Sequence, residues 1–346
     1  MGRKLLWASL VLAPVTFAAD LLDAGHVALF CLAAIALVPL AWLIGEATEH
    51  AAGHTGPGIG GFLNASFGNA PELIIALFAV ADSLPNVVRG SLAGSVVSNI
   101  LLVLGITLLL GPDRARLDRD SLLAQLGLVV VAVLAFLVPS VPGFHGDPER
   151  HSLAVVGIPV SLVVLALYLG VTIANLRRHR RRHAASGETA TGWSLPRALV
   201  ALALATAATA VISEILVHSL DSFAKAAGFS QFFVAVVIVA IVGNAAEHGG
   251  AVVIARRGNA KLATEIAISS SAQVALLVTP AIALLSFVVT PALSLAFRPI
   301  ELAAMGAAAI FVGIVIHDGR SRRWEGALLM AVYLALVGAF FAVGDR

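Results

Sequence analysis

The chain of 346 residues is 59% hydrophobic and only 12% charged, with a formal net charge of +2. Soluble domains are about a quarter charged, so the composition excludes an ordinary soluble protein, and the small net charge identifies no partner. Apolar runs of about 20 residues recur along the chain, the length that a helix needs to cross about 30 Å of hydrocarbon. We therefore expect an all-α polytopic membrane protein and not a β-barrel, whose strands are about 10 residues of alternating polarity.

Eleven apolar runs are long enough to be transmembrane helices. In chain order they cover residues 5–22, 26–45, 57–80, 87–110, 121–139, 152–175, 196–218, 229–255, 262–286, 296–316 and 324–343. Arg3 and Lys4 precede the first run, as they would in a signal peptide. Because Phe17-Ala18-Ala19 is a poor cleavage site, we expect this helix to be retained.

The distribution of Lys and Arg predicts the orientation. With the N-terminus in the cytoplasm and alternating spans, seventeen of the 22 Lys and Arg residues fall on the inner side. Cytoplasmic loops carry such an excess of positive charge. We therefore expect a multi-pass protein of the cell inner (plasma) membrane, whose basic run Arg177–His183 lies near anionic lipid rather than nucleic acid.

Two apolar spans contain the same polar block. Gly68-Asn69-Ala70-Pro71-Glu72 matches Gly243-Asn244-Ala245-Ala246-Glu247 at an offset of 175 residues. The spans that follow also correspond, since GSLAGSVVSN in span 87–110 is matched by TEIAISSSAQ in span 262–286. The chain therefore contains an internal repeat.

The repeat predicts the domain organisation. Residues 1–25 form an extra N-terminal helix, residues 26–175 a first five-helix repeat, residues 176–195 a basic cytoplasmic linker and residues 196–346 a second five-helix repeat. Because five is odd, the second repeat enters the membrane from the opposite side. Such inverted repeats are typical of transporters whose substrate site lies near the bilayer midplane, between the repeats.

The repeated blocks supply oxygen atoms on shared helix faces. Asn69 and Glu72, like Asn244 and Glu247, are three residues apart, a spacing that puts both side chains on one face. Ser95 and Asn99 are four residues apart, as are Ser269 and Gln273. An all-oxygen set with two carboxylates suits a hard divalent cation such as Ca²⁺, which takes 6–8 oxygen ligands, better than a soft metal.

The two glutamates also suggest how transport is driven. A charged side chain at the bilayer centre costs about 2.5–3.5 kcal/mol on insertion scales, and two close carboxylates cannot both stay ionised and empty. The hypothesis is that Glu72 and Glu247 hold either a cation or protons, so that the carrier exchanges rather than leaks.

Several segments resemble the calcium/proton exchanger (CAX) family of the Ca²⁺/cation antiporter superfamily. Gly60–Val80 and Phe229–Val252 are similar to the two α-repeats of that family, and further similarity lies in Gly45–Gly56, Ala93–Gly105, Ile212–Ser222 and His317–Leu334. The resemblance covers nearly the whole chain in the order of the family. Ala240 departs from it, because the family usually has proline there, and Gly249-Gly250 replace the usual alanines, which leaves the bend of that helix open.

The resemblance implies export of cytosolic Ca²⁺ in exchange for protons. It implies that Glu72 and Glu247 bind Ca²⁺ and H⁺ alternately, and that the first span is the extra helix of family members. The implied neighbours of the glutamates are Asn69, Asn244, His248, Ser95, Ser98, Asn99, Ser270 and Gln273.

Glu46, Glu49, Glu214 and His248 are interpreted individually. Glu46 and Glu49 are either a solvated helix end or a cytoplasmic relay for cations and protons. Glu214 lies inside a span, where an acid is by default functional, so we assign it to an access or proton path. His248 either accepts a proton beside Glu247 or is a hydrogen-bonded interior histidine.

Other functions are disfavoured by the residues present. The run Gly56–Gly61 fits G-x-G-x-x-G but lacks the strand that a dinucleotide site needs. His50 and His54 lack the H-E-x-x-H pattern of zinc proteases, so we expect no cofactor and no enzyme. A channel would use subunit rings instead of a repeat. A Na⁺-coupled antiporter, or one for Na⁺, Mn²⁺ or Mg²⁺, stays open, as does a homo-oligomer.

Overall fold

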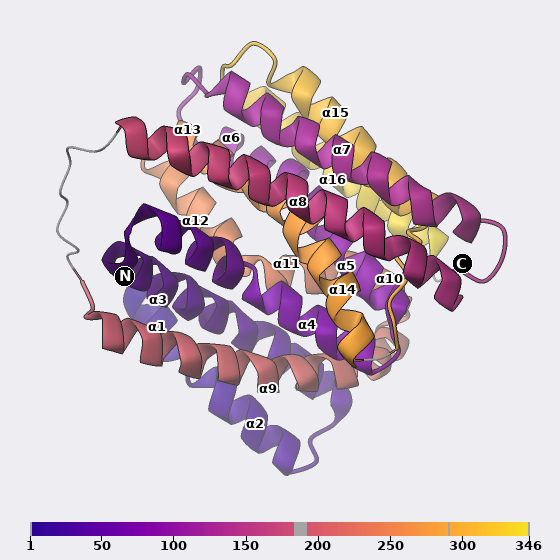
Figure 1. The fold of residues 1–346 in the computed structure, drawn as a ribbon. Coiled ribbons are helices and arrows are strands. Elements are labelled where there is room, and N and C mark those ends of the chain that lie inside the picture. Colours follow the sequence, from indigo (N-terminus) through magenta and orange to yellow (C-terminus); the bar gives the residue numbers. More distant parts are fainter. Residues whose placement is uncertain (1, 183–191, 290, 345–346) are drawn as a thin grey trace.

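The computed structural model describes residues 2–182, 192–289 and 291–344, without the side chains of residues 2–3, 56–62, 64–65 and 175–182. Every named element in these residues is helical, so the all-α prediction is confirmed (Figure 1). Residues 183–191 of the predicted linker 176–195 lie outside the described residues, and they include His183, the end of the basic run Arg177–His183.

Most helices lie within the predicted spans, but some spans are divided by a break or by a π-helical segment. Their bounds are α1 Gly2–Ser9, α2 Leu12–Leu21, α3 His26–Gly68, α4 Ala70–Ala81, α5 Pro85–Val97, α6 Leu104–Leu110, α7 Arg119–Gly143, α8 His151–Arg182, α9 Leu195–Ala227, α10 Gln231–Phe233, α11 Ala240–Gly243, α12 Ala245–Arg256, α13 Ala260–Gln273, α14 Thr279–Val289, α15 Pro299–Val315 and α16 Arg323–Val343. Three π-helical segments join consecutive α-helices, namely η1 Ser98–Val103, η2 Val234–Val239 and η3 Val274–Val278.

Eight helical stretches in the described residues are long and apolar enough to cross a membrane. One further pair, Gln231–Gly243 and Ala245–Arg256, passes the same test together but is bent by 58° at the break. Two shorter apolar helices are Ala70–Ala81 and Pro299–Val315. The structure therefore has the character of a multi-pass membrane protein, while the count of eleven spans stays a prediction.

Helix α3 differs from the prediction. The sequence predicts a connection between spans 26–45 and 57–80, whereas the helical hydrogen bonding continues from His26 to Gly68. The chain nevertheless turns back, because His50 stacks on Trp193 before α9 while Asp82 pairs with His218 near the far end of α9. The reversal falls between residues 50 and 69, a stretch rich in glycine, where helices bend most readily.

Packing between distant segments builds the interior. Helix α3 packs on α9, α7 on α15, α6 on α16, α8 on α14, and α5 on η2. Figure 1 shows α4, α5 and α11 between α3 and α9 on one side and α7, α8 and α15 on the other. Large apolar side chains on the outer helices, such as Leu134, Val163 and Leu204, are exposed, which suits surfaces that face lipid.

The crossing of α5 and η2 is unusually close. A Cβ atom at Gly94 would lie 2.0 Å from the carbonyl oxygen of Val236, so no larger residue fits without moving a backbone. Small residues let membrane helices approach in this way. The contact fixes α5, which carries Ser95, against the segment that leads to Asn244.

Candidate cation-binding site

Two helix breaks bring the repeated polar blocks into the interior. Asn69 separates α3 from α4, and Asn244 separates α11 from α12. Both asparagines have similar backbone angles, with φ of −100° and −91°, and neither side chain caps the following helix. Their amide groups are therefore available to other segments, and Glu72 and Glu247 each lie in the first turn after the break.

The two glutamates cross over to the opposite break. A Cβ atom at Gly243 would lie 3.3 Å from Cγ of Glu72, and one at Gly68 would lie 3.6 Å from Oε1 of Glu247. Each carboxylate is thus packed against the glycine that precedes the other asparagine. Since these glycines end α3 and α11, the last carbonyl groups of both helices are close to the carboxylates.

A chain of hydrogen bonds connects the second break with α5 and η1. Asn244 Nδ2 donates to Ser95 Oγ at 2.8 Å and to the carbonyl of Ala240 at 3.0 Å. Asn99 Nδ2 donates to Asn244 Oδ1 at 3.2 Å. His248 Nε2 lies 2.9 Å from Asn99 Oδ1, which requires a hydrogen on Nε2. His248 is thus hydrogen-bonded in the interior, and its role in accepting a proton stays a prediction.

Helix α13 supplies partners to both blocks. Ser270 Oγ donates a hydrogen bond to Glu247 Oε2, and Asn69 Nδ2 donates to Gln273 Oε1 at 2.8 Å. Ser98 is buried but donates to the carbonyl of Ser95 at 3.2 Å, within its own segment. Each predicted neighbour of the glutamates thus bonds to another residue of the predicted set, although Ser98 does so only through the backbone carbonyl of Ser95.

Burial makes the ionised form of the carboxylates energetically costly. Only 7% of Glu72 is exposed, and its Oε2 atom is buried without a hydrogen-bond partner among the described residues. A buried carboxylate in this state is costly unless a cation or a proton neutralises it. The arrangement can therefore bind a cation through carboxylate, hydroxyl and carbonyl oxygens, the ligands that hard divalent ions take.

The predicted access residues lie away from this centre. Glu46 Oε1 is 3.4 Å from His50 Nε2, and Glu49 is exposed nearby on α3. Glu214 is exposed towards the far end of α9, in a groove of about 240 Å³ that Asp20, His26 and His218 also line. Glu46 and Glu214 therefore lie towards opposite ends of the packed pair α3 and α9.

A cluster of aromatic rings surrounds Trp193, just before α9. The ring centroid of Trp7 is 5.4 Å from that of Trp42 and 5.9 Å from that of Trp193. On the other side, His50 stacks on Trp193 at 4.9 Å and His54 Nε2 lies 2.7 Å from the carbonyl oxygen of Trp193. The cluster joins α1, α3 and the start of α9.

A buried arginine network at the opposite end has no signature in the sequence. Arg89 on α5 is 1% exposed, and its guanidinium donates to Glu149 Oε1 at 2.5 Å, to Asn86 Oδ1 at 2.9 Å and to the carbonyl of Ser294 at 3.2 Å. The sequence marked Arg89 only as one of the few outer basic residues. Nothing in its local pattern indicates partners 60 and 205 residues away.

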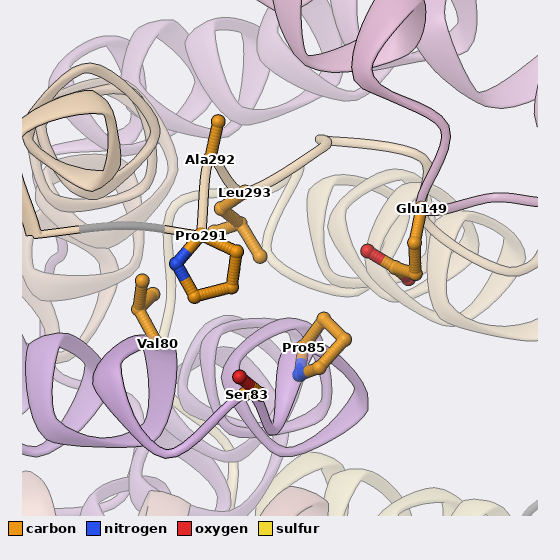
Figure 2. A pocket seen from close by; sticks show the side chains of 7 residues that line it. All are labelled: Val80, Ser83, Pro85, Glu149, Pro291, Ala292 and Leu293. Carbon is orange, nitrogen blue, oxygen red and sulfur yellow. The ribbon is translucent and has the colours of Figure 1, made fainter.

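A pocket of about 190 Å³ lies beside this network. Figure 2 shows its lining side chains, namely Val80, Ser83, Pro85, Glu149, Pro291, Ala292 and Leu293. Glu149 is the only charged residue among these. In Figure 2 its carboxylate is directed toward the side of the pocket on which Pro291 and Leu293 lie. Three connections, α4 to α5, α7 to α8 and α14 to α15, therefore meet at this end.

Comparison with known proteins identifies relatives over the whole chain. The model of the family described as sodium/calcium exchanger protein matches residues 25–177 and 197–342. The Ca²⁺/H⁺ antiporter ChaA of Bacillus subtilis is 36% identical over 338 residues, which are 95% of this chain and 96% of that protein.

Solved structures share the fold. The structure of native YfkE has a TM-score of 0.84 at 33% identity and covers 97% of this chain and 99% of that chain. The crystal structure of the H⁺/Ca²⁺ exchanger CAX has a TM-score of 0.75, covering 99% of this chain and 91% of that chain. Its identity of 18% makes this second likeness one of fold alone.

Proposed function

The chain belongs to the calcium/proton exchangers within the sodium/calcium exchanger family, and on this premise we propose that it is a Ca²⁺/H⁺ antiporter that exports cytosolic Ca²⁺. The observation that carries the proposal is the crossing of Glu72 and Glu247 over the two helix breaks, with Glu72 Oε2 buried and without a hydrogen-bond partner among the described residues. The proton gradient drives export, and the protein is a carrier and not an enzyme.

In the proposed cycle, the two carboxylates bind Ca²⁺ from one side and protons from the other. In this proposal Ser95, Ser270 and Gln273 complete the oxygen set, and Ser270 already donates a hydrogen bond to Glu247. Asn99, Asn244 and His248 position these ligands, because their amide and imidazole groups bond to one another. Ser98 supports the helix of Ser95, and Asn69 holds Gln273.

Access to the site involves the ends of the α3 and α9 pair. Glu46 and Glu49 provide negative charge at one end and Glu214 at the other. In this proposal, Glu46 and Glu49 attract Ca²⁺ from the cytoplasm, and Glu214 lies on the proton path. The exposure of Glu49 and Glu214 and the partial exposure of Glu46 support a role in access rather than in tight binding.

The domain organisation is proposed as one N-terminal helix and two inverted five-helix repeats, residues 26–175 and 196–346, around the linker 176–195. The family model matches the chain twice, once on each side of the linker. Helix packing supports the repeat, because corresponding helices of the two halves make equivalent contacts. The contact of α6 with α16 has its counterpart in that of α14 with α8, and the contact of α7 with α13 has its counterpart in that of α15 with α5. Eight long helices, one bent pair and two short apolar helices are compatible with eleven spans.

The proposed location is the cell inner membrane, with the N-terminus in the cytoplasm. Contacts between connections agree with this topology. The loops before α7 and α16 bond to each other, as expected for two cytoplasmic loops, while Glu149 and Ser294 meet Arg89 at the outer end. The excess of Lys and Arg on the inner side supports the direction.

The test is ⁴⁵Ca²⁺ flux in proteoliposomes with pH and Na⁺ gradients imposed separately. We expect uptake with a proton gradient. We expect loss of uptake in Glu72→Gln and in Glu247→Gln, because each variant removes one of the two carboxylates to which Ca²⁺ and protons bind in turn. Glu265→Gln, the same change at a glutamate of α13, serves as the matched control and should retain uptake. Normal uptake in either central variant, or uptake driven only by Na⁺, would contradict the proposal.

A further inference from the structure

The connections before α7 and before α16 form one built structure. Arg114 N donates to the carbonyl of Ser321 at 2.6 Å, and Ser321 N donates to the carbonyl of Ala115 at 2.9 Å. Ser321 Oγ donates to the carbonyl of Pro112 at 2.7 Å and accepts from Ala115 N at 3.0 Å. The two loops are therefore held together by their backbones and by the buried hydroxyl of Ser321.

A basic pocket opens on this pair of loops. It has a volume of about 460 Å³ and is lined by Asp113, Arg114, Arg320, Arg322 and Trp324; we call it the arginine pocket. Arg322 is committed to Asp318 at 2.5 Å and to Glu325 at 3.4 Å. The other two arginines of the pocket are Arg114, from the loop before α7, and Arg320, from the loop before α16.

These two arginines are available to an added anion. The side chain of Arg114 is 81% exposed, and its Nε atom is 4.0 Å from Asp113, the limit of an ion pair. No ion pair of Arg320 exists with the residues whose side chains the structure describes. Guanidinium groups present paired N–H donors that match the oxygens of a phosphate group.

The backbone at Arg114 is strained. Its φ angle is +59°, in the left-handed region that long side chains seldom adopt. Strain of this kind persists only where the surrounding structure imposes it, and it is concentrated at functional positions. Here the same residue donates its backbone N–H to the carbonyl of Ser321 and contributes its side chain to the lining of the pocket.

The location suits a lipid headgroup. In the proposed topology both loops are cytoplasmic, and the cytoplasmic leaflet carries anionic lipid. Trp324 lies in the first turn of α16 and is 59% exposed, as expected for an aromatic side chain at the level of the headgroups. The volume of the arginine pocket exceeds what a bare phosphate ion fills.

We propose that the arginine pocket binds a phosphate group, supplied by the headgroup of an anionic phospholipid of the cytoplasmic leaflet. The bound phosphate lies between Arg114 and Arg320 and braces the two loops. Because α16 packs on α6, which continues from the segment that carries Asn99, the lipid stabilises the fold behind the cation site.

The test measures thermal unfolding of the full chain in neutral detergent with added lipid. We expect phosphatidylglycerol to raise the unfolding temperature by at least about 2 °C, and phosphatidylcholine to raise it far less. The double variant Arg114→Gln/Arg320→Gln should lose most of this gain. Arg256→Gln/Arg257→Gln, two exposed arginines outside the pocket, is the matched control and should retain it.

Three outcomes would overturn the proposal. An equal loss in both double variants would mean that surface charge in general attracts the lipid. An equal gain from inorganic phosphate at millimolar concentration would assign the pocket to a free anion. If the double variant does not fold, native mass spectrometry of Arg320→Lys, which keeps the charge without the paired donors, replaces it, and retention of phosphatidylglycerol equal to the unaltered protein would contradict the proposal.

Discussion

At the scale of single residues, the packing of each glutamate against the other break decides how precisely the site is held. Gly243 leaves room for Cγ of Glu72, and Gly68 leaves more room beside Glu247. The two glycines therefore differ in how much they constrain the carboxylate that crosses over them. This difference can be measured.

We expect Gly243→Ala to weaken Ca²⁺ transport about tenfold, equivalent to about 1.4 kcal/mol. Its Cβ would be 3.3 Å from Cγ and 3.7 Å from Cδ of Glu72, so the carboxylate must shift. Alanine is also a better helix former than glycine, so the loss would not come from an unfolded α11. The measurement is the Ca²⁺ concentration dependence of ⁴⁵Ca²⁺ uptake.

Gly68→Ala is the control for this prediction. Its Cβ would be 3.6 Å from Glu247 Oε1, an ordinary van der Waals contact. We expect a smaller effect than that of Gly243→Ala. Equal effects would show that the two contacts do not differ in the way that the distances indicate.

At the scale of helices and connections, two ion pairs differ in how deeply they are buried. The pair between Arg89 and Glu149 ties α5 to the loop before α8 and buries the arginine completely. The pair between Asp118 and Lys261 joins the start of α7 to the start of α13 at 2.8 Å, with both side chains substantially exposed. Burial should make the first pair the more costly one to break.

We expect Glu149→Gln to lower the free energy of unfolding by about 2 kcal/mol, because the buried Arg89 would lose its charged hydrogen-bond acceptor. Asp221→Asn, which breaks the exposed pair with Lys225, should cost clearly less, because exposed ion pairs contribute little to stability. Thermal unfolding of both variants in detergent compares them. A smaller loss for Glu149→Gln than for Asp221→Asn would refute the structural role of the network.

The Asp118 pair predicts a pH dependence. The hydrogen bond from the Lys261 ammonium group lowers the pKa of Asp118. A lowered folded pKa adds stability above the unfolded value of about 3.9, and this stability is lost as the pH falls through the folded pKa. We expect Asp118→Asn to be slightly less stable than the unaltered protein at pH 7, by under about 1 kcal/mol.

This difference should close on acidification. The unfolding temperatures of Asp118→Asn and of the unaltered protein, measured from pH 7 downwards, should converge below about pH 4. High salt should reduce the difference at pH 7 as well, because exposed ion pairs are screened. A gap that stays constant with pH would assign the effect of the substitution to something other than the ion pair.

At the scale of the whole molecule, the orientation can be tested with single cysteines. Cys31 is the only cysteine of the chain, so Cys31→Ala provides a background without thiols. In right-side-out vesicles, a membrane-impermeant thiol reagent should label His145→Cys, in the loop before α8, and spare Asp120→Cys, at the start of α7. Inverted vesicles should show the reverse pattern, and the same pattern in both would contradict the topology.

The sequence was informative where local chemistry is distinctive. The matching polar blocks at residues 68–72 and 243–247 are visible in the sequence, and the structure has a helix break at the asparagine of each block. It was uninformative where a contact depends on the tertiary arrangement. The bond from Ser271 Oγ to the carbonyl of Val96 and the partners of Arg89 join residues far apart in the chain, and no local pattern encodes them.

Helix α3 shows a second limit. Its stretch around residues 46–56 contains charged residues and glycines, which predicted a connection between spans, yet the helical hydrogen bonds continue through it. Helical hydrogen bonding depends on the backbone, and a membrane protein loses much by leaving such groups unpaired. The polar residues of this stretch therefore indicate where the chain leaves the hydrocarbon region, and not where the helix ends.

The aromatic cluster around Trp193 has an optical consequence. Three of the four tryptophans of the chain, Trp7, Trp42 and Trp193, belong to it. Most of the ultraviolet fluorescence of the protein therefore originates where α1, α3 and the start of α9 meet. A change in emission during transport would report directly on movement at this junction, without an attached dye.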